Sequence, residues 1–114
     1  MQQSSIKPNT NKKVVIMDQR AARGIKKFSQ PAREELTSLI VALEKEGFLK
    51  EPEAKKITSE IFEMRVAQEK KQYRACYAYL AHPEIILLSA FEKQTNKTPI
   101  KEIRLAQKRL QAYK

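Results

Sequence analysis

The sequence predicts one small α+β domain, in which a four-stranded, mainly antiparallel sheet carries two N-terminal helices packed on one face and is followed by a C-terminal helix. Two patterns indicate this class. Helical periodicity marks residues 18–47, and residues 61–94 then form strand-length apolar and aromatic runs divided by two short breaks, which favour hairpins over long crossovers. At 114 residues the chain can build one hydrophobic core but not two.

The amino-terminal end combines a polar stretch with a short apolar run. Residues 1–11 contain a proline and show no periodicity, which predicts a mobile tail before a domain over residues 12–114. The run 14–17 fits a first strand at the edge of the sheet, so that four strands are expected in all.

Two helices are expected next. Asp18 is a suitable N-cap for a short first helix, and Pro31 suits the first turn of a second helix that Gly47 ends. The charged residues 48–60 then predict a loop, whose lysines at positions 50, 55 and 56 are either solvated or at the rim of a cationic sheet face. The second helix has an apolar stripe that should cover the core face of the sheet, namely Leu36, Leu39, Ile40 and Leu43.

The first break in residues 61–94 predicts a hairpin with an unusual charge pair. A turn centred on residues 69–70 places Gln68 opposite Lys71 and Arg65 opposite Arg74. Like charges directly opposite each other destabilise a sheet by a few tenths to about 1 kcal/mol. Another interaction must therefore favour this arginine pair.

The second break, at residues 82–83, predicts the next hairpin and with it the core. A turn centred there places Leu80 opposite Ile85 and Arg74 opposite Phe91. Because side chains alternate between the two faces of a sheet, one face collects the apolar residues. Its expected members are Phe62, Met64, Val66, Tyr73, Ala75, Tyr77, Tyr79, Ile86, Leu88 and Ala90.

The opposite face concentrates cations. One interpretation is a solvated outer face whose arginines pair with Glu63 and Glu92, since many antiparallel sheets leave one face wet. The other is an anion site, because guanidinium groups bind phosphate oxygens with paired hydrogen bonds and an exposed Phe91 can stack on a base. The expected members of this face are Glu63, Arg65, Ala67, Gln72, Arg74, Cys76, Ser89, Phe91 and Lys93.

The net charge indicates a polyanionic partner. With 23 Lys plus Arg against 13 Asp plus Glu, the formal charge is +10 and the pI about 9.8, which fits nucleic acid, ribosomal RNA or an acidic protein segment. No apolar run approaches the roughly 20 residues that cross a bilayer, and the amino terminus has no signal-peptide core. We therefore expect a cytoplasmic protein without membrane contact.

Few residues are available for other chemistry. The single cysteine, Cys76, cannot form an internal disulfide, and the single histidine, His82, is expected at a surface turn. Neither Gly24 nor Gly47 lies in a phosphate-binding loop pattern. We expect neither a metal site nor a bound cofactor.

The C-terminal segment predicts a basic helix. Thr98 is expected as its N-cap, with Pro99 in the first turn, and the helix should run towards Tyr113. One side carries Ile103, Ala106, Leu110 and Tyr113, and much of the remainder carries Lys101, Arg104, Lys108 and Arg109.

Four motifs occur in a specific order, FExR at 62–65, YRxxY at 73–77, LLxxFxK at 87–93 and TPxxEI at 98–103. The series resembles the RelE/HigB-like toxins of type II toxin–antitoxin systems, in particular the phage-derived HigB branch, and the likeness extends over about residues 14–113. The resemblance implies a small α+β endoribonuclease that cuts mRNA in the ribosomal decoding site. It also implies a cognate antitoxin, expected to carry a DNA-binding domain, that holds the toxin inactive.

The resemblance assigns roles to individual residues. Arg65, Arg74 and Lys93 match the family's basic strand positions and are the expected catalytic residues. Phe91 matches the aromatic residue of the last strand and is expected to bind RNA. Some relatives carry a histidine or tyrosine near the carboxyl end as acid–base candidates, whereas no histidine lies beyond His82 here. Further cations expected to bind RNA are Lys97, Lys70, Lys71 and Lys101.

Such residues suit a cleavage in which RNA supplies its own nucleophile. If the 2′-hydroxyl attacks the adjacent phosphate, the protein has mainly to hold that geometry and stabilise charge on the phosphate, without a metal. Arg65 and Arg74 would bind the phosphate, Lys93 would bind it or transfer a proton, and Glu63 is a candidate base unless it only orients Arg65. One alternative is a non-catalytic RNA- or ribosome-binding protein that uses the same face. Another is a protein that mainly binds an acidic partner and contributes to DNA binding as a complex.

Overall fold

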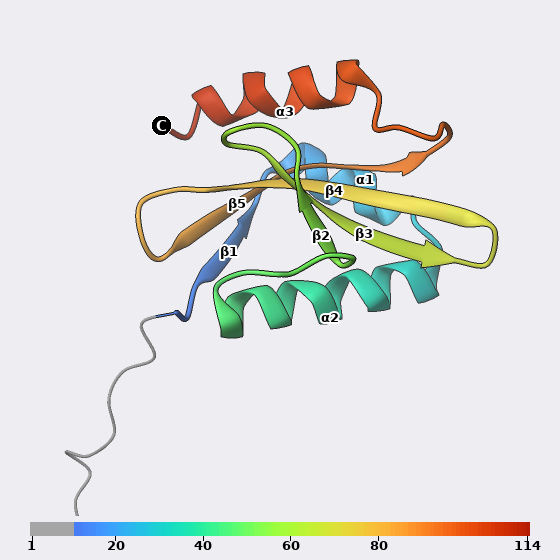
Figure 1. Ribbon diagram of the computed structural model, residues 1–114, viewed down its shortest axis with the longest axis horizontal. Helices are drawn as coiled ribbons and strands as arrows, with labels where there is room; N and C mark the ends of the chain where they lie inside the picture. Colours follow the sequence, from blue (N-terminus) through green and yellow to red (C-terminus); the bar gives the residue numbers. More distant parts are fainter. Residues whose placement is uncertain (1–10) are drawn as a thin grey trace, which may run out of the picture.

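A five-stranded sheet lies between helices in the computed structural model, which describes residues 11–114 (Figure 1). The strand order is β1-β5-β4-β3-β2; β1 runs parallel to β5, and the other neighbouring pairs are antiparallel. The α+β class and the edge position of β1 are confirmed, whereas the predicted mobile tail lies outside the described residues except for Asn11. The elements in chain order are β1 (Val14–Met17), α1 (Gln19–Lys26), α2 (Gln30–Glu46), β2 (Ala54–Lys56), β3 (Phe62–Gln68), β4 (Lys71–Tyr79), β5 (Glu84–Lys93) and α3 (Ile100–Gln111).

Within the described residues, the sheet has one strand more than the four that the sequence predicts. The additional strand is β2, which lies in the segment expected to be a loop and pairs with β3 from Ala54 opposite Met64 to Lys56 opposite Phe62. Only Ala54 of its three residues is buried. A strand this short, flanked by charged residues, has too little alternation to be predicted.

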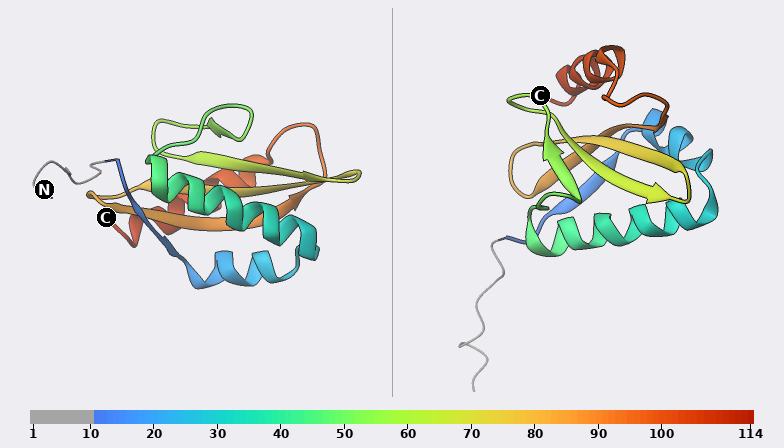
Figure 2. Two further views of the ribbon diagram at one scale, coloured as in Figure 1. Left: turned by 90° about the horizontal axis from the view of Figure 1, so that it is seen from below. Right: turned by 45° about the vertical axis from the view of Figure 1, so that its right-hand side comes forward.

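Helices α2 and α3 cover opposite faces of the sheet (Figure 2). The N-cap of α2 is Ser29, and the helix ends at Gly47, whose φ of 85° lies in the left-handed region that favours glycine. The predicted stripe is confirmed, since Leu36, Leu39 and Leu43 are buried and the partly buried Ile40 packs against the same core. No helix among residues 11–114 has the length and apolar character needed to cross a membrane.

Helix α1 packs along β5 at one side of the sheet, whereas α2 packs across β3 and β1. Its predicted N-cap is confirmed, because Asp18 accepts a hydrogen bond from the backbone N–H of Arg20. Pairing between β1 and β5 stops at Met17 opposite Leu87, and α1 packs against the stretch of β5 beyond that point. Only Ala21 of α1 is fully buried, and it joins the core beneath α2.

A β-bulge shifts the register of the second hairpin. The predicted pairs Arg65–Arg74 and Arg74–Phe91 are both confirmed. Beyond Cys76 the pairing moves by one residue, so that Tyr79 faces Ile85, and the predicted pairing of Leu80 with Ile85 is wrong. A bulge adds one residue to one strand without interrupting its apolar run, so alternation alone does not reveal it.

The bulge gives the sheet two apolar faces instead of one. Ile85 and Leu87 face α2, whereas Ile86 and Leu88 face α3, so the placement of the latter two in the α2 core is wrong. The opposite face is therefore not simply a wet surface, because α3 covers part of it. The core beneath α3 consists of Ile61, Cys76, Ala78, Ile86, Leu88, Ala106 and Leu110.

Gly24 allows α1 to lie directly against β5. A Cβ at this position would be 2.3 Å from the carbonyl oxygen of Ala90, so any side chain must displace the helix. We expect Gly24→Ala to lower the free energy of unfolding by about 1 to 3 kcal/mol, measured by urea denaturation. The exposed Lys26 on the same helix supplies the control, because Lys26→Ala should change stability by no more than about 0.5 kcal/mol. Equal stability of Gly24→Ala and the wild type would contradict the close packing of α1.

Candidate functional site

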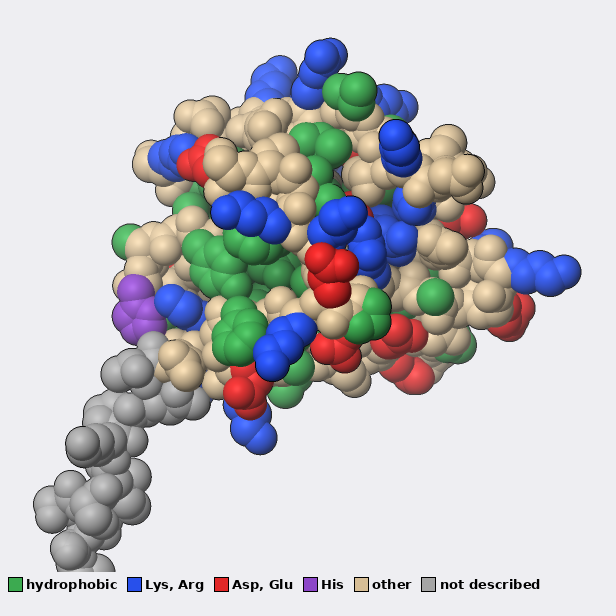
Figure 3. Space-filling view, in the orientation of Figure 1, with side chains coloured by type: hydrophobic (Ala, Val, Ile, Leu, Met, Phe, Trp, Pro, Cys, Tyr) green, Lys and Arg blue, Asp and Glu red, His purple; other side chains and the backbone are tan. Residues whose placement is uncertain are grey.

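Cations collect on the α3 side of the sheet, beyond the part of β4 and β5 that α3 covers. Arg74 of β4 lies between Arg65 of β3 and Phe91 of β5, and Lys93 follows Phe91 on the same face. Phe91 is half-buried against the core beneath α3, so it is less exposed than the sequence predicts. Figure 3 shows Lys and Arg side chains gathered near the centre of the molecule, beneath α3. We call Glu63, Arg65, Arg74, Phe91 and Lys93 the cationic face.

Glu63 is a buried carboxylate that connects the two arginines. Its side chain is only 2% exposed, and its Oε1 accepts a hydrogen bond from Arg65 Nε at 3.4 Å and lies 3.5 Å from Arg74 Nε. Its Oε2 accepts a hydrogen bond from the Thr98 hydroxyl at 2.5 Å. These contacts supply the interaction that offsets the repulsion between Arg65 and Arg74. Because both oxygens are engaged and shielded, Glu63 is placed to position the arginines.

Arg74 is buried instead of lying on a wet surface. Its side chain is 8% exposed, and it donates to the carbonyl oxygen of Tyr73 at 3.0 Å and to Gln72 Oε1 at 2.9 Å. Burial lowers the pKa of Arg74, and the charge of Arg65 lowers it further, while Glu63 opposes both. The hydrogen bonds to Tyr73 and Gln72 hold the guanidinium in one orientation before any ligand binds.

Lys93 approaches the same charges from β5. Its Nζ donates to the carbonyl oxygen of Asn96 at 2.7 Å, in the loop that joins β5 to α3. Partial desolvation lowers the pKa of Lys93, and the neighbouring charges of Arg74 and Arg65 add to that shift. A lysine with a lowered pKa releases its proton more readily than a free one.

Three other reactive side chains lie in different settings. Cys76 is fully buried, and burial raises the pKa of its thiol to about 12, so it stays protonated. His82 is an exposed turn residue, as predicted, and its Nδ1 lies 2.9 Å from the Nζ of Lys13. The Tyr113 hydroxyl donates to the buried carboxylate of Asp18 at 2.7 Å, an interaction that raises the pKa of Tyr113. Tyr113 therefore holds the end of α3 near the start of α1.

Comparison with protein families identifies the chain. A model described as "Phage derived protein Gp49-like (DUF891)" matches residues 23–111, which include the whole cationic face. The chain belongs to the Gp49-like family. This is a RelE/HigB-type toxin family, so the predicted resemblance is confirmed, and the Gp49-like chain is a toxin of the toxin–antitoxin class.

Comparison with solved structures supports the fold of this Gp49-like chain. It is similar to a free-state E. coli toxin RelE mutant in which two arginines are replaced by alanine, with a TM-score of 0.64 and 18% sequence identity. The match covers 86% of the Gp49-like chain and 97% of the RelE chain. At this identity the likeness shows a RelE-like fold. The comparison with curated proteins gives no match.

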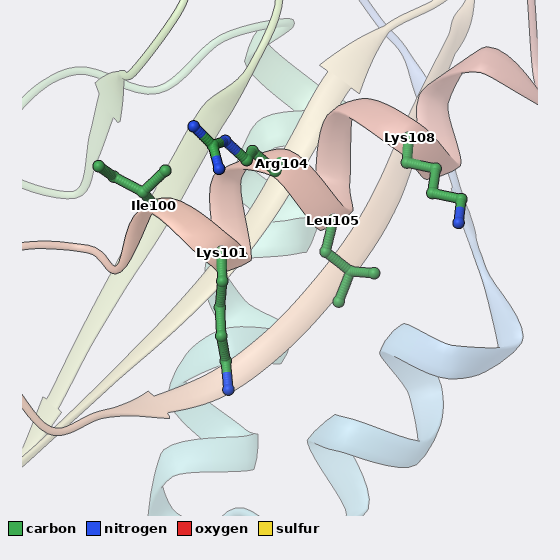
Figure 4. Close-up of a pocket in the computed structure, with 5 residues that line it drawn as sticks. All are labelled: Ile100, Lys101, Arg104, Leu105 and Lys108. Carbon is green, nitrogen blue, oxygen red and sulfur yellow. The ribbon is translucent and has the colours of Figure 1, made fainter.

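The remaining cations predicted to bind RNA are scattered over the Gp49-like chain. Lys97 is exposed in the loop that follows Lys93, next to the cationic face. Lys70 lies at the β3–β4 turn, and Lys71 lines a cavity on the α2 side. Lys101 projects from the outer side of α3, where it lines a shallow hollow of about 480 Å³ (Figure 4).

The role of Thr98 does not follow from the sequence. The prediction makes it the N-cap of the last helix, but Pro99 occupies that position and makes no side-chain capping bond. The Thr98 hydroxyl instead binds Glu63, which lies 35 residues earlier in the chain. The available signal is the TP pair of the TPxxEI motif, whose partner cannot be read from spacing. Among residues 11–114, no group of three or more His, Cys, Asp or Glu side chains is arranged to hold a metal ion.

Proposed function

We propose that this Gp49-like toxin is a ribosome-dependent endoribonuclease that cleaves mRNA in the cytoplasm. Arg65, Arg74 and Lys93 are its catalytic residues. The observation that carries the proposal is the pairing of Arg65 and Arg74 on adjacent strands, where Glu63 engages both guanidinium groups from within the protein. Guanidinium groups fixed in this way suit the oxygens of a phosphodiester.

Charge stabilisation on the phosphate is the main catalytic task in this scheme. The 2′-hydroxyl of the RNA attacks the adjacent phosphorus, a 2′-O–P bond forms, and the bond from phosphorus to the 5′-oxygen of the next nucleotide breaks. Negative charge builds on the non-bridging oxygens, where Arg65 and Arg74 neutralise it. Because the guanidinium groups stabilise this charge, the protein need not supply a metal ion.

Lys93 is suited to protonate the leaving group. Its lowered pKa favours transfer of a proton to the departing 5′-oxygen, while the proton of the 2′-hydroxyl passes to water. Phe91, which lies opposite Arg74 in the sheet, packs against a neighbouring base. Lys97 contacts a phosphate beside the cleaved one, and Lys70, Lys71 and Lys101 contribute weaker contacts with RNA at a distance.

The resting partner is a cognate antitoxin, itself expected to carry a DNA-binding domain. We propose that an acidic antitoxin segment covers the cationic face, since complementary charge both speeds association and blocks access of RNA. The net charge of +10 favours such a partner.

A non-catalytic toxin that blocks the ribosome through the same face is the second candidate. The settings of the three acid–base candidates favour it, because none of them is placed to exchange a proton with RNA at the cationic face. Cys76 is buried and protonated, Tyr113 is bound to Asp18, and His82 lies at the turn before β5. The cationic face therefore lacks the side chain whose ordinary pKa lies nearest neutrality. A catalytic toxin with this face would depend on stabilisation of the phosphate charge and on proton transfer from Lys93.

Inducible expression separates the two candidates. We expect growth arrest that the cognate antitoxin relieves, accompanied by cuts in a reporter mRNA. A matched reporter that lacks a start codon should remain intact, because ribosomes do not translate it. Arrest with both messages intact would favour the non-catalytic toxin, and cuts in both messages would contradict ribosome dependence.

A further inference from the structure

A second basic feature lies beside the cationic face, between α1 and α3. This α1–α3 groove has a volume of about 460 Å³, and β5 forms its floor. Its walls carry Arg20 and Arg23 of α1, Lys27 at the C-cap of that helix and Arg109 of α3, against a single carboxylate, Glu102. Gly24 keeps α1 close to β5, so that the α1 cations stand directly beside the floor.

The α1 cations follow one side of the helix. Their i, i+3, i+7 spacing aligns Arg20, Arg23 and Lys27 over about 10 Å at 1.5 Å per residue. Arg20 is paired with Asp18. Among the described residues, neither Arg23 nor Lys27 forms an ion pair with an acidic side chain. Two cations of the α1–α3 groove are therefore available to an anion.

Arg109 reinforces the positive charge from the opposite wall. It donates to the carbonyl oxygen of Leu88, the residue that the β5 bulge leaves without a partner in β4. Burial lowers the pKa of Arg109, and repulsion from Arg20 and Arg23 lowers it further, while Asp18 and Glu102 oppose the shift. A bound anion would relieve this repulsion.

Phe91 connects the groove to the cationic face. It lines the α1–α3 groove and is also the cross-strand neighbour of Arg74. A chain of phosphates that passes Phe91 can therefore reach Arg74 at one end and Arg23 and Lys27 at the other.

We propose that the α1–α3 groove binds the phosphate backbone of the same single-stranded RNA whose cleaved phosphate lies at Arg74. This inference rests on the proposed function and extends it, because it defines the path of the substrate across β5. An acidic amphipathic helix is a poorer fit, since such a helix needs a row of apolar anchors. The larger apolar side chains that line the groove are Phe91 and Leu105.

Binding of uncleavable RNA tests the path. The probes are fluorescent 2′-O-methyl RNAs of roughly 4 and roughly 16 nucleotides, which span the usual site sizes of single-strand binding domains. The groove variant is Arg23→Glu with Lys27→Glu, and the matched control is Lys12→Glu with Lys26→Glu, which changes the net charge equally outside the groove. A second groove variant, Arg23→Gln with Lys27→Gln, replaces the first if circular dichroism shows that it does not fold.

We expect the groove variant to bind the long RNA at least tenfold more weakly and the short RNA as the wild type does. Removal of two phosphate contacts should also reduce the slope of log K against log salt by about 1.4. Equal weakening in the groove variant and the control would overturn the proposal, because net charge alone would explain it. Unchanged affinity of the groove variant for the long RNA would also overturn it.

Two further measurements separate this inference from the proposed function. If the groove variant keeps its affinity for RNA but loses its affinity for the cognate antitoxin, the groove binds an acidic protein segment and the RNA path is wrong. Arg74→Ala is assayed in parallel for mRNA cleavage. If Arg74→Ala abolishes cleavage while the groove variant binds long RNA normally, only the RNA path fails. Full cleavage by folded Arg74→Ala would defeat the proposed function itself.

Discussion

Arg74→Ala is expected to reduce the rate of ribosome-dependent mRNA cleavage by about 10²- to 10³-fold, the usual cost of losing one donor that stabilises charge in the transition state. The arginine is fixed before RNA binds, by its hydrogen bonds to Tyr73 and Gln72 and its ion pair with Glu63. Alanine removes this preorganised positive charge, and water that takes its place must reorient to stabilise the charge on the phosphate. Primer extension on a reporter mRNA, with purified ribosomes and toxin, measures the rate.

Burial of Arg74 makes a second variant necessary. Alanine also removes one of the two guanidinium groups that neutralise Glu63, which is 2% exposed, and so affects stability as well as activity. Arg74→Lys keeps the positive charge but loses the planar fork, and we expect it to melt near the wild-type temperature while cleaving at least about tenfold more slowly. Wild-type cleavage by either variant, in protein that thermal melts show to be folded, would contradict the role of Arg74.

Leu39→Ala is expected to act through stability alone. Leu39 is 7% exposed in the core between α2 and the sheet, and truncation there should cost about 2 to 5 kcal/mol of unfolding free energy. Val41 lies on the outer side of the same helix and is 56% exposed, so Val41→Ala should change stability by no more than about 0.5 kcal/mol. Urea denaturation of both variants measures the difference.

Activity per folded molecule distinguishes Leu39→Ala from the Arg74 variants. The cleavage rate of Leu39→Ala should match that of the wild type once it is divided by the folded fraction, because Leu39 lies in the core beneath α2, on the opposite face of the sheet from the cationic face. Equal stabilities of Leu39→Ala and Val41→Ala would show that the buried side of α2 is assigned incorrectly.

Local signals explain why most of the fold could be predicted from the sequence. The N-cap at Asp18, the stop at Gly47 and the stripe on α2 each depend on residues within a few positions of one another. The bulge in β5 gives no such local signal, because its extra residue, Leu88, is as apolar as its neighbours. Only the packing of α3 over one face and α2 over the other shows which of these side chains belongs to which core.

The same contrast holds for the candidate site. The Arg65–Arg74 pair could be predicted because a two-residue turn lies only a few residues away and sets the register. The contact of Thr98 with Glu63 depends on the return of the chain after β5, which no local pattern fixes. The α1–α3 groove likewise forms only when α1 and α3 meet over β5.

The chemical identity of the cut ends is the most direct test of the claim that the RNA supplies its own nucleophile. A reporter mRNA is prepared with a single 2′-deoxynucleotide immediately before the mapped cleavage position, alongside a matched all-ribose message. We expect the all-ribose message to yield a 2′,3′-cyclic phosphate, or the 3′-phosphate derived from it, upstream and a 5′-hydroxyl downstream, and the substituted message to remain uncut at that position. Cleavage at the deoxynucleotide, or downstream fragments that carry a 5′-phosphate, would contradict the account.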